Sequence, residues 1–197
     1  MIEIYERVRG EILSRVVKSK LDLSDISLIS MNCLGGVLYI DCGEKFLTPT
    51  IDLFFEPSDF IKFVNNLDLY LNEVPRVVMG PHFPVGVLGN IKIYFMHYNS
   101  PDEAKQKWED RKRRINKDRI FVIMVDRYGL SKKDFEDFKR IKYPKLLLTN
   151  KKDFQCDDSI YMPKYRKLDE LPDIIPGRRM YYKMALPKAI NKTFKSK

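Results

Sequence analysis

The spacing of apolar and polar residues divides the chain into segments with two different periods. Apolar residues four positions apart in residues 2–20, and a one-sided apolar face in residues 57–73, predict amphipathic helices. Short and almost continuous apolar runs at residues 25–32, 119–126 and 143–150 predict strands that are buried on both faces of a sheet. The pattern therefore predicts an alternation of helices and buried strands.

This alternation determines the expected fold. Residues 100–116 begin with the capping-box pattern Ser-Pro-Asp-Glu, and residues 131–141 also begin on a serine, so both segments are predicted helices. Helices between buried strands predict an α/β protein with a largely parallel, doubly wound, Rossmann-like sheet and helices on both faces. Residues 26–32, 91–98 and 119–126 are expected to be strands of that sheet.

The charge is distributed unevenly along the 197 residues. Lysine and arginine number 36 and aspartate and glutamate 27, giving a net charge of +9, yet residues 178–197 hold seven basic residues and no acidic one. We therefore expect one α/β domain over residues 1–177 and a basic C-terminal tail over residues 178–197, with room for one short helix. The tail is either a weak contact for an anionic surface or simply a solvated segment.

Several classes of protein do not fit this sequence. The longest uncharged window, residues 26–40, is too short for a membrane span, and residues 1–10 lack the apolar core of a signal peptide. Three cysteines without a C-x-x-C spacing, and only two histidines, argue against disulfides and structural metal sites. We expect a cytoplasmic protein, at most peripheral to the inner face of the membrane, with no transmembrane segment, no metal and no specific nucleic-acid partner.

Candidate catalytic residues follow the predicted strands, where ligands bind in open α/β sheets. Cys33 follows the first strand and is a candidate nucleophile, for which Asn32 and the N–H groups of Gly35 and Gly36 could stabilise an oxyanion. His97 ends another predicted strand and is the candidate general base. The alternative is that Cys33 is a small buried residue, that the glycines merely turn the chain, and that His97 is structural.

Two arginines on the helix after His97 are candidates for substrate binding. Arg111 occupies a position that is otherwise apolar in the helical pattern, and Arg114 follows three residues later. An arginine at such a position either pairs with a buried acid or binds a phosphate. Both interpretations of Arg111 remain open at this point.

The motifs in combination resemble a family of bacterial proteins of unknown function, often labelled exopolysaccharide biosynthesis proteins (domain of unknown function 1919). The resemblance covers about residues 25–165. Its motifs are Asn32-Cys33 with Gly35-Gly36, Pro49-Thr50, His97-Tyr98, Trp108, Arg111 and Arg114-Ile115-Asn116.

This resemblance implies a role in surface-polysaccharide assembly. The Asn-Cys-x-Gly pattern is similar to the nucleophile turn of capsule acetyltransferases, which implies a transferase that acylates a carbohydrate through Cys33, with His97 as base, and with Tyr98, Arg111 and Arg114 near the substrate. Those enzymes carry an Asp-x-x-His pair near the C-terminus, whereas this chain has no histidine after His97.

Two alternatives stay open, a metal-independent glycosyltransferase and a non-catalytic glycan-binding or scaffolding subunit. The expected partner is a carbohydrate or lipid-linked saccharide. No permanently bound cofactor is expected, and an acyl-CoA or a nucleotide sugar would be the co-substrate.

Overall fold

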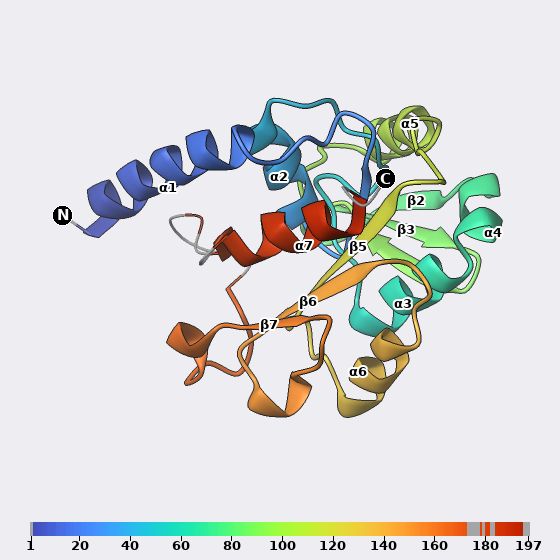
Figure 1. Ribbon diagram of the computed structural model, residues 1–197. Coiled ribbons are helices and arrows are strands. Elements are labelled where there is room, and N and C mark those ends of the chain that lie inside the picture. The colour runs from blue at the N-terminus through green and yellow to red at the C-terminus, as the bar shows by residue number, and fades with distance from the viewer. Residues whose placement is uncertain (1, 173–177, 179, 182–183, 195–197) are drawn as a thin grey trace.

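The computed structural model describes residues 2–172, 178, 180–181 and 184–194, which form two separate sheets with helices around them (Figure 1). The predicted domain boundary at residue 177 lies outside the described residues. The helices are α1 (Ile2–Lys18), α2 (Leu34–Cys42), α3 (Pro57–Asn65), α4 (Leu67–Asn72), α5 (Pro101–Lys112), α6 (Lys132–Lys139) and α7 (Ala185–Phe194). The strands are β1 (Ser27–Ser30), β2 (Arg76–Met79), β3 (Pro84–Leu88), β4 (Ile91–Tyr94), β5 (Ile120–Val125), β6 (Lys145–Thr149) and β7 (Ser159–Tyr161).

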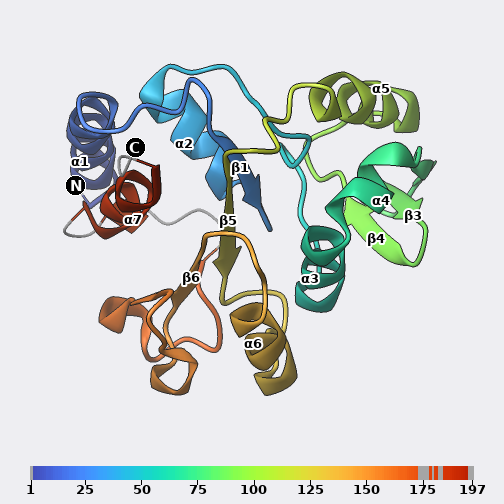
Figure 2. The same ribbon diagram turned by 45° about the vertical axis from the view of Figure 1, so that its right-hand side comes forward.

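The larger sheet has four parallel strands in the order β1-β5-β6-β7. All six residues of β5 are buried, because helices cover both faces of the sheet. Figure 2 shows α1, α2 and α7 on one side of this sheet and α3 and α6 on the other. The predictions of an α/β protein and of buried strands near residues 26–32 and 119–126 are confirmed.

The prediction that residues 91–98 belong to the parallel sheet is wrong. β4 pairs antiparallel with β3 in a separate three-stranded sheet of the order β2-β3-β4. Only Gly89 and Asn90 separate β3 from β4, and a two-residue connection can join only antiparallel strands. Gly89 has the positive φ of 57° that such a turn requires.

One extended segment joins the two sheets. The backbone of Phe54 exchanges two hydrogen bonds of 2.9 Å with Tyr94, the last residue of β4. The next N–H, that of Phe55, donates to the carbonyl of Met31 just after β1 at 3.0 Å. Phe54 and Phe55 therefore lie between the end of the parallel strand β1 and the end of the antiparallel strand β4.

The sequence Cys-Leu-Gly-Gly is not a flexible turn. Only residues 31–33 connect β1 to α2, and Gly35 and Gly36 lie in the first turn of that helix. A Cβ on Gly35 would lie 2.8 Å from the Cβ of Ser30, so the glycine permits the helix to pack closely on its own strand. The expectation that Gly35 and Gly36 turn the chain is therefore wrong, because both residues are helical.

The C-terminal segment packs into the core. Met180, Tyr181, Leu186 and Ile190 are all buried there, so the segment does more than carry positive charge. Asp41 of α2, itself buried, accepts hydrogen bonds from Ser14 of α1 and from Arg178 and Tyr181, the last at 2.7 Å. These contacts hold three distant parts of the chain together.

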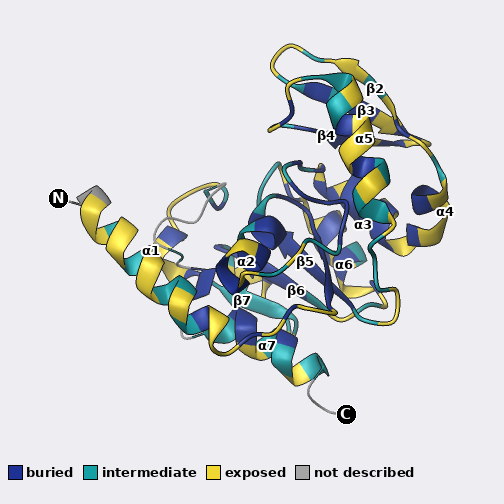
Figure 3. Ribbon diagram, turned by 90° about the horizontal axis from the view of Figure 1, so that it is seen from above, coloured by how far each residue is buried: buried dark blue, intermediate teal, exposed yellow. Residues whose placement is uncertain are grey.

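The N-terminal helix behaves differently along its length. Leu13 and Val17 contact the core, whereas Ile4, Val8 and Ile12 form an exposed apolar stripe. Figure 3 shows the N-terminal half of α1 projecting away from the remaining elements. None of the helices in the described part of the chain is long and apolar enough to cross a membrane.

Candidate active site

The end of β1 places a thiol at the N-terminus of a helix. Cys33 occupies the N-cap position of α2 with φ of −61° and ψ of −6°, is half-buried, and its carbonyl accepts the first helical hydrogen bond from Val37. Its side chain does not cap the helix, so the N–H groups of Gly35 and Gly36 are not consumed by it. Cys33 therefore lies at the positive end of the α2 helix dipole.

Asn32 supplies a second group at the same helix end. Its Oδ1 accepts a hydrogen bond from the N–H of Leu34 at 3.2 Å, which fixes the amide against the first turn of α2. Its Nδ2 is buried and finds no acceptor among the described residues. A buried donor without an acceptor costs about 1–3 kcal/mol, so a ligand or water oxygen at Nδ2 would be bound favourably.

The segment from Ile51 to Leu53 lies between Cys33 and His97. The Sγ of Cys33 lies 4.0 Å from the carbonyl oxygen of Leu53, and the backbone N–H of His97 donates to the carbonyl of Asp52 at 3.3 Å. Asp52 has a φ of 61°, a conformation that non-glycine residues adopt rarely and often at functional sites. The thiol of Cys33 and the backbone of His97 thus contact consecutive residues of one segment, and the His97 side chain is exposed.

Tyr98 and Arg111 contact this segment through Ile51 and Asp52. The hydroxyl of Tyr98 donates to the carbonyl of Ile51 at 2.8 Å and accepts from Nη1 of Arg111 at 2.6 Å. Nη2 of Arg111 lies 3.6 Å from the carboxylate of Asp52, and its guanidinium lies over the ring of Phe46. Burial raises the pKa of the Tyr98 hydroxyl well above its usual value, so Tyr98 stays protonated. Through these contacts with the backbone of Ile51 and the carboxylate of Asp52, both side chains hold the segment in position.

Arg114 is the last of the predicted substrate-binding residues. Arg114 is half-buried just after α5 and forms no ion pair among the described residues.

Beyond β5, the fully buried Asp126 accepts a hydrogen bond from Thr149 at 2.7 Å and pairs with Lys151 at 2.8 Å. This pair extends the line of polar groups from β1 across to β6.

Sequence reasoning missed the residues after β6. Asn150 and Lys151 follow a buried apolar strand in the same way that Asn32 and Cys33 follow β1. The argument from the carboxyl ends of parallel strands therefore applies to them equally. A buried strand followed by polar residues was the signal that could have identified them.

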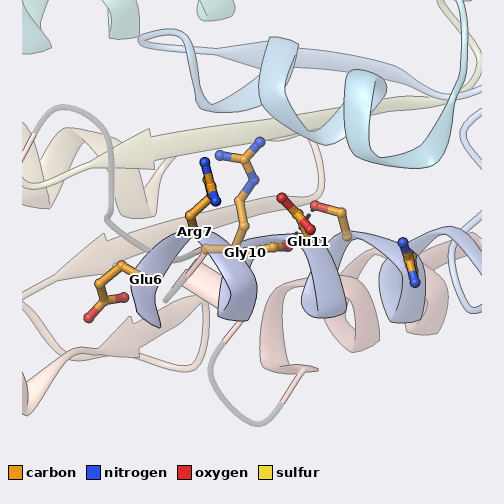
Figure 4. Close-up of a pocket in the computed structure, with 7 residues that line it drawn as sticks. Glu6, Arg7, Gly10 and Glu11 are labelled. Atoms are coloured by element: carbon orange, nitrogen blue, oxygen red, sulfur yellow. Dashed lines mark hydrogen bonds between the residues drawn. The ribbon is translucent and has the colours of Figure 1, made fainter. Parts of the chain in front are cut away.

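A groove of about 560 Å³ also runs along α1, but it lacks comparable chemistry. Its lining contains both acidic and basic residues of the helix, together with Arg178. In Figure 4, Arg7 and Glu11 extend from the same side of the helix, and Glu6 lies nearer its N-terminal end. None of its described lining residues is a cysteine, a histidine or the end of a strand, so we place the candidate active site at Cys33.

The fold and the site define an α/β protein whose candidate reactive groups gather at the carboxyl end of a parallel strand. The chain belongs to the family described as a domain of unknown function (DUF1919), whose model matches residues 4–190. A protein of Haemophilus influenzae, named only as uncharacterized, is 32% identical to it over 164 residues. That similarity covers 82% of this chain and 80% of the Haemophilus protein.

Proposed function

We propose that the protein is an acyltransferase that modifies a carbohydrate through Cys33 during exopolysaccharide assembly. The observation that carries the proposal is the thiol of Cys33 at the N-terminus of α2, preceded in the sequence by Asn32, whose buried Nδ2 has no acceptor among the described residues. A helix end and an unused donor are what a thiolate nucleophile and an oxyanion require. The likeness of the Asn-Cys-x-Gly pattern to capsule acetyltransferases supports the polysaccharide context.

The reaction proceeds in two steps. The thiolate of Cys33 attacks the carbonyl carbon of an acyl-CoA thioester, the bond to the CoA sulfur breaks, and CoA leaves as a thiol with the proton that His97 had taken from Cys33. A sugar hydroxyl then attacks the acyl-cysteine, gives its proton to His97, and returns Cys33 to the thiolate. In each step Asn32 and the N–H groups of α2 stabilise the oxyanion.

The experiment is to incubate the chain with acetyl-CoA and to locate the acetyl group by mass spectrometry of the intact protein and its peptides. We expect acetylation of Cys33, complete loss of the label in Cys33→Ala, and labelling at least about 100-fold slower in His97→Gln, which is the lower range for a general base. Cys156→Ala is the matched control, since Cys156 is also a half-buried thiol and lies outside the site.

The outcomes separate the alternatives. Equal labelling of Cys33 and Cys156, or no labelling with any short acyl-CoA, would refute the acyl-enzyme. A transfer of whole sugars that survives Cys33→Ala would instead support a glycosyltransferase. Saccharide binding without either reaction would support a glycan-binding subunit.

A further inference from the structure

A second cleft, separate from Cys33, opens at the carboxyl ends of β6 and β7. It has a volume of about 450 Å³, which is within the range of small-molecule sites. The first residue of α6 lies on one wall, and the residues that follow β6 form another. Its lining includes Lys132, Asn150, Lys151, Lys152, Tyr161 and Arg166.

The positive charge of this cleft is only partly neutralised. Lys151 pairs with the buried Asp126, so its charge is already balanced. Lys132, Lys152 and Arg166 are exposed and form no ion pair with any residue that the structure describes. Asp153, also in the lining, balances one of these three charges, and the cleft therefore attracts an anion.

Asn150 adds a buried hydrogen-bond acceptor to the cleft, which an anion without hydroxyl groups does not satisfy. Its Nδ2 donates to the carbonyls of Tyr165 at 3.0 Å and Leu168 at 2.6 Å, which settles the orientation of the amide. Its Oδ1 is buried, and no described residue donates to it. A ligand with hydroxyl groups would supply the missing donor.

We propose that this cleft binds a sugar phosphate. Lys132, Lys152 and Arg166 contact the phosphate, since arginine and lysine donate charge-assisted hydrogen bonds to phosphate oxygens. A sugar hydroxyl donates to Oδ1 of Asn150. The position at the ends of parallel strands is where open α/β sheets bind ligands. The proposal does not rest on the chemistry of Cys33.

The test is calorimetric titration of the full chain with glucose 1-phosphate. We expect a Kd below about 1 mM and a rise of at least about tenfold in both Lys152→Ala and Arg166→Gln, because each removes a charge-assisted hydrogen bond. These residues are exposed, so the variants should fold, which circular dichroism verifies. Lys167→Ala is the control, because it removes an exposed neighbouring charge outside the lining and should leave Kd unchanged.

Further titrations test each half of the proposal. Inorganic phosphate should bind at least about tenfold more weakly than glucose 1-phosphate, because it leaves Oδ1 of Asn150 without a donor from the sugar. Cys33→Ala should bind like the wild type, so failure of the acyl-transfer mechanism leaves this result intact. Equal affinity for the two ligands, an equal effect of Lys167→Ala, or no measurable binding would each overturn the proposal.

Discussion

At the scale of single residues, the adjacent glycines Gly35 and Gly36 differ in how much space surrounds them. Both lie in the first turn of α2, where neither has a positive φ. A Cβ on Gly35 would meet the Cβ of Ser30 at 2.8 Å, which is shorter than real contacts between carbon atoms. A Cβ on Gly36 would lie 3.5 Å from Cδ1 of Ile51, an ordinary contact. Only Gly35 is therefore required by packing.

This difference predicts opposite results for the two alanine variants. Gly35→Ala should lower the free energy of unfolding by about 1–3 kcal/mol, as overpacking does, because Ser30 sits on a strand that cannot move away. Gly36→Ala should be neutral or stabilising by up to about 1 kcal/mol, since alanine favours the helix. Urea unfolding, followed by circular dichroism, measures both. Equal losses would indicate that the N-terminus of α2 is constrained in some other way.

At the scale of elements, the hydroxyl of Tyr39 on α2 forms hydrogen bonds with the backbone at β1. Its buried hydroxyl donates to the carbonyl of Ile26 at 2.6 Å and accepts from the N–H of Leu28 at 3.0 Å. Burial raises the pKa of Tyr39 to about 12 from its usual value of 10. The helix that carries Cys33 at its N-cap thus depends on a neutral phenol for its position on the strand.

Stability should consequently fall at alkaline pH. Below pH 10 the phenol is protonated in both states, whereas between pH 10 and 12 the unfolded state loses the proton first, which costs roughly 2–3 kcal/mol of stability. Unfolding free energies measured from pH 8 to 12 should show this decline. Tyr39→Phe should make it shallower above pH 10 without abolishing it, because burial also raises the pKa values of Tyr94 and Tyr98. Burial also raises the pKa of the Cys42 thiol to about 12, so a decline that begins near pH 9 should remain in the variant. An unchanged slope in Tyr39→Phe would contradict the assignment.

The elements also show what the sequence could predict. The buried runs at β1, β5 and β6 were recognisable because a strand covered by helices on both sides must be apolar throughout. The alternation of β4 indicated a strand correctly, but alternation does not say which sheet the strand joins. The two-residue turn at Gly89-Asn90 does say so, because a connection this short can only join β3 and β4 as an antiparallel hairpin. The contacts of Asp52 with Arg111 and His97 depend on this arrangement, so they could not be predicted from local patterns.

At the scale of the whole molecule, charge composition alone gives a misleading view of the C-terminal segment. Its basic residues suggested a tail in solvent, yet Leu186 and Ile190 of α7 are fully buried and Lys188 is exposed between them. An amphipathic helix can therefore present lysines to solvent on one face and still complete the core with the other. The segment is joined to α1 and α2 by the contacts of Asp41 as well.

Two variants of α7 decide whether this segment is part of the folded core. Ile190→Ala removes a fully buried side chain and should lower the free energy of unfolding by about 2–5 kcal/mol, from lost burial and the cavity that remains. Lys188→Ala alters an exposed position of the same helix and should change it by less than about 0.5 kcal/mol. Chemical denaturation of both proteins with matched m-values gives the comparison. If Ile190→Ala were as stable as Lys188→Ala, residues 184–194 would be dispensable for folding, and the positive charge of the segment would be its main property.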